Sequence, residues 1–261
     1  QYKISQGAEF FMNKFLILIL SLFLTSCAHS DWRTADRSSA NIAPLPTETK
    51  EAIVNIYVAR TFNWHKYLAV HSWVAFKEKD AKGYMVYHVI GWRARNGGES
   101  VIGKKDIPDR KWFGSMPELI TDIRGKKAET AIPHIKAAIQ SYKYQNSYRL
   151  YPGPNSNSFV SHIIRNVDEL QVELPPNAIG KDWLNGGKFF AMSESGTGVQ
   201  VSIFGLLGVT LGLAEGIEIN VLGLSFGLDV LSPAIKLPAV GRLGFKDAPV
   251  FRDEDLKNKE D

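Results

Sequence analysis

The segment from Tyr151 to Val160 constrains the fold most, because it joins a stiff turn to the start of a helix. Its opening Pro152–Pro154 has two fixed φ angles around a glycine that accepts either sign of φ. Four short polar residues follow at Asn155–Ser158, and both types, Asn and Ser, are favoured at helix N-caps. Apolar residues then recur at helical spacing, at Phe159, Val160, Ile163, Ile164 and Val167. We therefore expect a helix that begins with a cluster of small polar side chains.

The chain near its beginning has the pattern of an exported lipoprotein. Met12 is a plausible start, and Lys14 precedes an apolar run from Phe15 to Leu24 that is too short to span a bilayer as a helix. Small residues then lead to Cys27, which resembles the lipid-modified cysteine of bacterial lipoproteins. The alternative is an ordinary secretory signal with an incidental cysteine. With Ala28 next, the resemblance implies anchoring in the outer membrane, facing the periplasm.

Cysteine content and charge exclude several classes of function. Cys27 is the single cysteine, so we expect no disulfide and no thiol for catalysis or metal binding. The formal net charge of +4 is spread without a long basic run, which gives no sign of nucleic-acid binding. No His or carboxylate cluster has metal-ligand spacing, and no cofactor is expected. The expected partners are the membrane, through lipidated Cys27, and an unknown envelope component.

The remaining pattern predicts one α+β domain with an antiparallel sheet and a few packed helices. Residues 1–26 are interpreted as upstream residues and signal peptide, 27–50 as lipid anchor and tether, 51–246 as the domain, and 247–261 as a charged tail. We expect strands at 51–61, 66–77 and 84–92, and helices at 117–124 and 126–142. The Gly-rich segments 199–212 and 217–231 predict a long C-terminal β-hairpin, which is interpreted as packed core or a partner surface.

Several motifs resemble a bacterial family known as domain-of-unknown-function family 3750. They are residues 152–159, 174–182, 71–74, 89–92 and 202–212, so the resemblance spans most of residues 54–244. The resemblance implies no activity, because none is assigned to the family.

A second resemblance concerns mechanism. Residues 155–160 are similar to the Asn-Cys-x-x-Phe-Val helix start of circularly permuted papain-like and NlpC-like hydrolases, with Ser156 in place of the cysteine. This resemblance implies a permuted papain-like fold with Ser156 as nucleophile and His71, on an earlier strand, as base. His88 or Asn157 would orient the base, and helix amides near Asn155 and Asn157 would form part of an oxyanion hole.

Each of these residues also has a structural interpretation. Ser156 can be an N-cap residue, His71 and His88 can be strand histidines, and Lys181 with Asp182 can form a loop ion pair instead of lining the same cleft. Two functions follow from the two interpretations. The first is a lipid-anchored binding or structural module, and the second is a hydrolase or transferase acting on an envelope amide or ester through Ser156 and His71.

Overall fold

The β-branched and aromatic strands of the first half of the chain form a five-stranded antiparallel sheet. Its order is β4-β3-β2-β1-β5. The two central strands are buried along almost their whole length, because elements cover both faces of the sheet. The strands are β1 (Ile53–Arg60), β2 (Val70–Lys77), β3 (Tyr84–Val89), β4 (Val101–Asp106) and β5 (Pro117–Arg124).

Helices cover one face of this sheet. The apolar side chains of α3 (Gly125–Ser141) and α4 (Ser156–Arg165) pack on Val54, Ile56 and Val74 in the main hydrophobic core. Pro133 lies inside α3 without ending it. The 3₁₀ helix η1 (Asn63–Tyr67) and the short α2 (Gly91–Arg95) connect strands at the end of the sheet.

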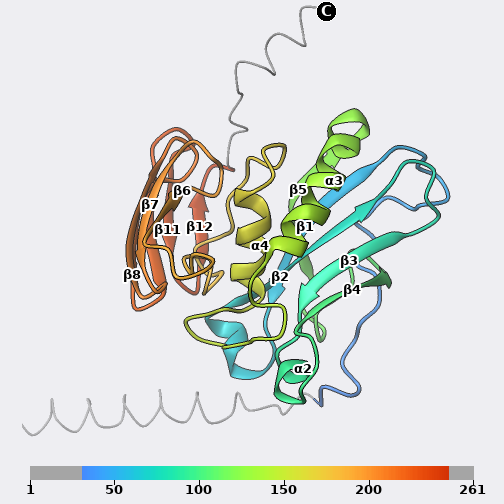
Figure 1. Ribbon diagram of the computed structural model, residues 1–261, viewed down its shortest axis with the longest axis horizontal. Helices are drawn as coiled ribbons and strands as arrows, with labels where there is room; N and C mark the ends of the chain where they lie inside the picture. Colours follow the sequence, from blue (N-terminus) through green and yellow to red (C-terminus); the bar gives the residue numbers. More distant parts are fainter. Residues whose placement is uncertain (1–30, 247–261) are drawn as a thin grey trace, which may run out of the picture. The chain divides into compact units, whose positions relative to one another are not determined.

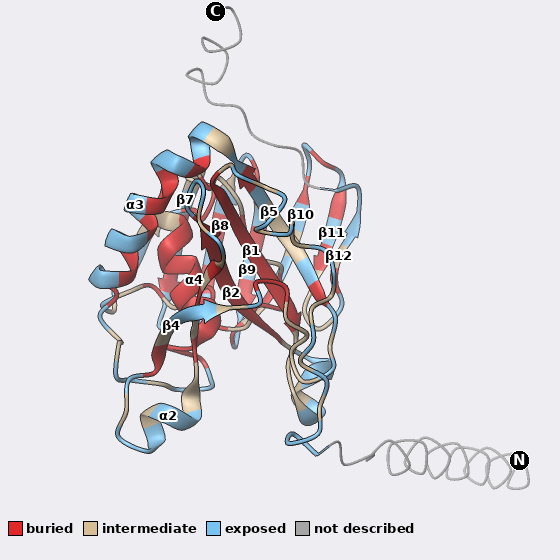
Figure 2. Cartoon of the chain, turned by 90° about the vertical axis from the view of Figure 1, so that its right-hand side faces the viewer, coloured by how far each residue is buried: buried red, intermediate tan, exposed pale blue. Residues whose placement is uncertain are grey.

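The last third of the described chain forms a second antiparallel sheet of seven strands in simple sequence order. The strands are β6 (Phe190–Met192), β7 (Gly198–Ile203), β8 (Leu207–Gly212), β9 (Gly216–Val221), β10 (Leu224–Asp229), β11 (Ala234–Leu237) and β12 (Gly241–Gly244). Figure 1 shows α4 between the two sheets. Figure 2 shows β1 and β2 coloured as buried, whereas β11 and β12 include exposed stretches.

The computed structural model describes residues 31–246, and the expected α+β class with antiparallel sheets is confirmed. Residues 31–35 belong to a separate unit and form a turn closed by the Thr34 amide and the Asp31 carbonyl, 3.2 Å apart. The signal peptide, Cys27 and the tail 247–261 lie outside the described residues. Within residues 31–246, no helix has the length and hydropathy that a membrane crossing requires.

Some local boundaries and one element type differ from the prediction. Residues 117–124 form strand β5 instead of a helix, because this segment pairs with β1, and α3 starts at Gly125. The predicted strand 66–77 starts at Val70, after η1, and the predicted strand 84–92 ends at Val89, where α2 follows.

The predicted C-terminal hairpin structure is confirmed, with more strands than expected. Each of its two segments folds back on itself, at 204–206 and 222–223, so the segments form four strands.

Part of the expected tether is attached to the domain. Asp109 accepts hydrogen bonds from the Ser39 hydroxyl at 2.7 Å and from the Ile42 amide at 2.8 Å. The Tyr84 hydroxyl donates to the Pro44 carbonyl at 2.9 Å. The segment from residue 36 to residue 44 is therefore attached to the loop after β4 and to β3.

Candidate functional site

The polar cluster at the start of α4 is a capping and docking structure. The Asn155 side chain accepts from the amides of Asn157 at 2.9 Å and Ser158 at 3.2 Å, and the Ser158 hydroxyl accepts from the Asn155 amide. Asn155 also donates to the carbonyls of Leu150 and Ile179. These bonds form a capping box and attach the helix start to two loops.

Asn157 fixes α4 against the first sheet. Its amide nitrogen donates to the carbonyls of Val70 and Ile179, at 3.0 and 2.8 Å, and its oxygen accepts from the Ser72 hydroxyl at 2.9 Å. The Ser72 hydroxyl also lies 3.2 Å from the carbonyl oxygen of Ser156. Asn157 therefore has protein partners for both ends of its side chain, which is a structural arrangement.

The structure does not bring Ser156 and His71 together. Ser72 on β2 points towards α4, and successive side chains of a strand point to opposite faces of its sheet. The neighbouring His71 therefore points away from α4, where its ring stacks on Trp112 with centroids 3.7 Å apart. Ser156 is at the α4 side, so a proton cannot pass directly from its hydroxyl to the His71 imidazole.

His71 and His88 are neighbours on that other face. Nε2 of His71 lies 3.4 Å from Nδ1 of His88. Burial lowers the pKa of His71 well below its ordinary value, and the adjacent His88 lowers it further. Burial, with Lys104 as the next cause, lowers the pKa of His88 to about 4. The pair is therefore neutral at neutral pH and, together with Trp112, forms part of an aromatic cluster.

Lys181 and Asp182 point to the second sheet and do not pair with each other. Lys181 forms a buried ion pair with Glu218, with 2.7 Å between Nζ and Oε2. Asp182 accepts from Asn220 and, at 3.0 Å, from the Ser225 hydroxyl. Both residues therefore attach the loop after α4 to β9 and β10, and neither lies with Ser156 in a common site.

One face of the second sheet, which we call the inner face, is polar and buried. Lys236 lies 2.5 Å from Glu173 and 3.0 Å from Glu218, so Glu218 joins Lys236 to Lys181. Burial raises the pKa of Glu173 well above its ordinary value, and the charge of Glu218 adds to this rise. Arg242 pairs with Asp229 at the end of the sheet, at 2.6 Å. The inner face is thus held by ion pairs and hydrogen bonds.

The opposite face, which we call the outer face, is apolar and exposed. All strand side chains that alternate with the buried polar ones are aliphatic or aromatic, and about half of the surface of most of them is exposed. The exposed ones are Val199, Val201, Ile203, Leu207, Val209, Leu211, Ile217, Ile219, Val221, Phe226, Leu228, Ile235 and Leu243. A contiguous apolar patch of this kind is typical of a binding surface. Period-two alternation in the sequence was the signal for it.

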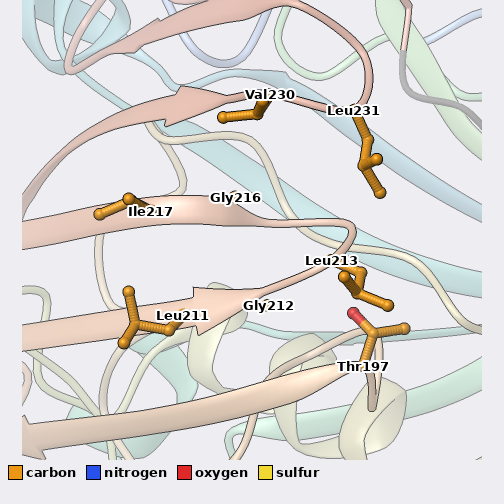
Figure 3. Close-up of a pocket in the computed structure, with 8 residues that line it drawn as sticks. All are labelled: Thr197, Leu211, Gly212, Leu213, Gly216, Ile217, Val230 and Leu231. Carbon is orange, nitrogen blue, oxygen red and sulfur yellow. The ribbon is translucent and has the colours of Figure 1, made fainter.

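A hollow lies at one end of the outer face. It has a volume of about 450 Å³ and lies at the turns that join β8 to β9 and β10 to β11. Figure 3 shows Leu213 and Leu231 beside it, with Ile217 and Leu211 on the adjoining strands. The hollow therefore extends the apolar surface and supplies little polar chemistry. Among residues 31–246, no group of three or more His, Cys, Asp or Glu residues has a geometry that could hold a metal ion.

The fold and this surface define a two-sheet α+β protein with an exposed apolar sheet face. The sequence model of the family described as "Protein of unknown function (DUF3750)" matches residues 51–183, which is about half of the chain. The chain belongs to this family. Neither the curated proteins nor the solved structures contain a match. The papain-like expectation is thus not confirmed. The match includes the first sheet, α3 and α4, and it ends before the second sheet begins.

Proposed function

We propose that this chain is an exported protein, acylated at Cys27, whose domain is a binding module that docks on a bilayer containing anionic lipids. The observation that carries the proposal is the outer face, where Val, Ile, Leu and Phe side chains cover a whole sheet without a charged residue. A bilayer accepts such a face because apolar side chains that leave water contribute about 25 cal/mol per Å². The cell envelope, at the outer membrane, is the expected location.

The charges around the outer face favour an anionic lipid surface as the occupant. Between residues 183 and 246, all four acidic residues are buried: Glu194, Glu215, Glu218 and Asp229. Arg242 is paired with Asp229, so the charged side chains of this segment that reach solvent without a carboxylate partner among residues 31–246 are Lys188 and Lys246. A second copy of the chain would bring these like charges together without carboxylates from this segment to pair with them. Anionic headgroups would instead neutralise them.

The length of the free chain is consistent with this docking. The segment from residue 36 to residue 44 is attached to the domain, so eight residues, 28–35, separate Cys27 from it. Eight extended residues span at most roughly 28 Å. An acyl chain on Cys27 would therefore hold the domain close to the bilayer, and a single chain needs a second contact for stable anchoring. The outer face would supply that contact.

Hydrolysis through Ser156 and His71 is not supported by the geometry, because β2 separates their side chains and Asn155 and Asn157 are used in capping and docking. Binding is the function that the arrangement of the described residues favours.

The test uses the full chain with Cys27→Ser, so that acylation does not contribute, and vesicles of phosphatidylethanolamine with phosphatidylglycerol. Val209 and Ile219 are register partners on the central strands of the outer face. We expect Val209→Asp with Ile219→Asp to weaken co-sedimentation more than about tenfold, because each buried aliphatic side chain contributes about 1.5–3 kcal/mol. Trp92→Asp, at an exposed position on α2, is the control.

Equal sedimentation of the double variant and the parent would overturn the proposal. A dimer in solution that Ile219→Asp abolishes would also overturn it, in favour of a second copy as the occupant. Acylation is tested separately by labelling with an alkyne analogue of palmitate, which Cys27→Ser should abolish.

A further inference from the structure

We infer that a cationic pocket at the β6 edge of the outer face binds the phosphate group of an anionic phospholipid. We call it the edge pocket; it has a volume of about 300 Å³ and lies between α4, the loop 183–188 and β6. This inference rests on the proposed function and goes beyond it, because it assigns a polar site to the lipid headgroup.

The position of the edge pocket is next to the apolar surface. Phe190 and Met192 of β6 line it, and they pair with Val201 and Val199 of β7. Paired residues of neighbouring strands point to the same face, so Phe190 and Met192 continue the outer face to its edge. A phosphate in the pocket would therefore have its acyl chains beside an apolar surface, as the chemistry of a phospholipid requires.

The lining of the edge pocket is positively charged. Lys143, Arg165 and Lys188 line it, and no carboxylate is among its lining residues. Arg165 is held in place by the Met192 carbonyl and, at 2.6 Å, by the Gln200 side chain. Neither Lys143 nor Lys188 forms an ion pair with a residue of the described chain. Two ammonium groups are thus available for an anion, beside a guanidinium of fixed orientation.

The loop 183–188 passes close to one of these lysines, Lys143. Gly186 and Gly187 have φ angles of 77° and 74°, which favour glycine. A Cβ on Gly186 would lie 3.0 Å from Nζ of Lys143, so a larger residue would displace the ammonium group. The loop at Gly186 therefore lies close to the Lys143 ammonium group.

His162 also lines the edge pocket, but both of its ring nitrogens already have protein partners. Nε2 lies 3.0 Å from the Ala138 carbonyl, and Nδ1 lies 3.2 Å from the side-chain nitrogen of Asn185. His162 therefore does not compete with the phosphate for the lysine ammonium groups.

The experiment measures binding of dihexanoyl phosphatidic acid, below its micelle concentration, to the full chain carrying Cys27→Ser by titration calorimetry. We expect Lys143→Gln with Lys188→Gln to weaken binding at least about tenfold, because two charge-assisted contacts are lost. Lys126→Gln with Lys127→Gln removes the same charge from exposed positions on α3 and should change affinity less than about twofold. Gly186→Val should act in the same direction as the pocket variant.

Two comparisons identify the source of the phosphate. Dihexanoyl phosphatidylcholine should bind at least about tenfold more weakly, because its headgroup is neutral overall. Inorganic phosphate should bind more weakly still, since it lacks acyl chains. Equal affinity of phosphate and lipid would overturn the assignment to a lipid, and unchanged affinity in the pocket variant would overturn the site.

The two proposals fail separately. If Val209→Asp with Ile219→Asp leaves vesicle binding unchanged but the pocket variant loses the soluble lipid, the edge pocket stands and bilayer docking is overturned. If the double aspartate variant detaches from vesicles but the pocket variant binds the soluble lipid as the parent does, docking stands and the edge pocket is overturned.

Discussion

The two sheets of this protein are stabilised in opposite ways. The first has an apolar core on both faces, with helices on one side and the aromatic cluster of Tyr57, Trp73 and Tyr84 on the other. The second buries ion pairs on its inner face and exposes aliphatic side chains on its outer face. A sheet that exposes its apolar face to water loses the usual benefit of folding. The difference therefore shows that burial of apolar side chains accounts for the first sheet but not for the outer face of the second, and this is the basis of the proposed docking on a bilayer.

Breaking the ion pairs of the inner face is expected to change the free energy of unfolding more than any other substitution considered for the two sheets. Lys236→Met leaves Glu173 and Glu218 buried without the cation between them. Removing one partner of a buried ion pair costs about 3–5 kcal/mol, so we expect a loss of that size in the free energy of unfolding. Urea denaturation followed by circular dichroism measures it. Lys246→Met, at an exposed position, should stay within about 0.5 kcal/mol, and a loss below about 1 kcal/mol for Lys236→Met would contradict the role of the network.

The same substitution in the two sheets should give different results. Ile56 on β1 is fully buried, whereas Ile219 on β9 is 49% exposed. We expect Ile56→Ala to lower the free energy of unfolding by about 2–5 kcal/mol through the cavity that it leaves. Ile219→Ala should change it by less than about 0.5 kcal/mol while weakening vesicle binding. Equal destabilisation in urea denaturation would show that the outer face is part of the core.

Most strands of the first sheet could be predicted from the sequence. Which face of the second sheet is buried could not. Runs such as Ile53–Tyr57 and the helical spacing after Ser158 identify their elements directly. Residues 117–124 were misassigned because pairing with β1 overrides a weak local pattern. In β7 to β10 the alternation was visible, but period two alone does not tell which face is buried. The interior position of Glu218 depends on Lys181 and Lys236, which are distant in the chain.

The positions of the candidate catalytic residues could not be predicted for a related reason. A helix start rich in Asn and Ser predicts a cap and a nucleophile equally well, and only the partners of each side chain decide between them. The sequence places His71 and Ser72 side by side, but it does not show that the serine contacts α4. The capping role of Asn155, by contrast, follows from local residues alone and is present in the structure.

We expect the free energy of unfolding to depend on pH through two histidines of the first sheet, whereas the outer face has no titratable side chain. The pKa values of His71 and His88 are lowered by burial, so the neutral forms stabilise the folded state. This contribution is complete above the ordinary histidine pKa of about 6.5 and is lost as the pH falls towards 4. We expect a loss of about 2 kcal/mol in the free energy of unfolding between these pH values. His88→Gln should reduce this loss in urea denaturation at matched pH. An unchanged pH profile in that variant would show that carboxylates alone cause the acid sensitivity.

The smallest effect is expected at Ser156, where the two functions first proposed for this chain give opposite outcomes. Ser156→Ala removes a hydroxyl at the first residue of α4, but the capping bonds come from Asn155 and Ser158, so stability should change by less than about 0.5 kcal/mol. A serine becomes nucleophilic only with a base in contact, and His71 lies on the other face of β2. Labelling with a fluorophosphonate should therefore be equal in the parent and in Ser156→Ala.

Asn155→Ala is the structural comparison, because loss of the N-cap should lower the free energy of unfolding by about 1 kcal/mol without any change in labelling. Labelling that disappears only in Ser156→Ala would restore the hydrolase interpretation, and it would require a base from the α4 side of the sheet.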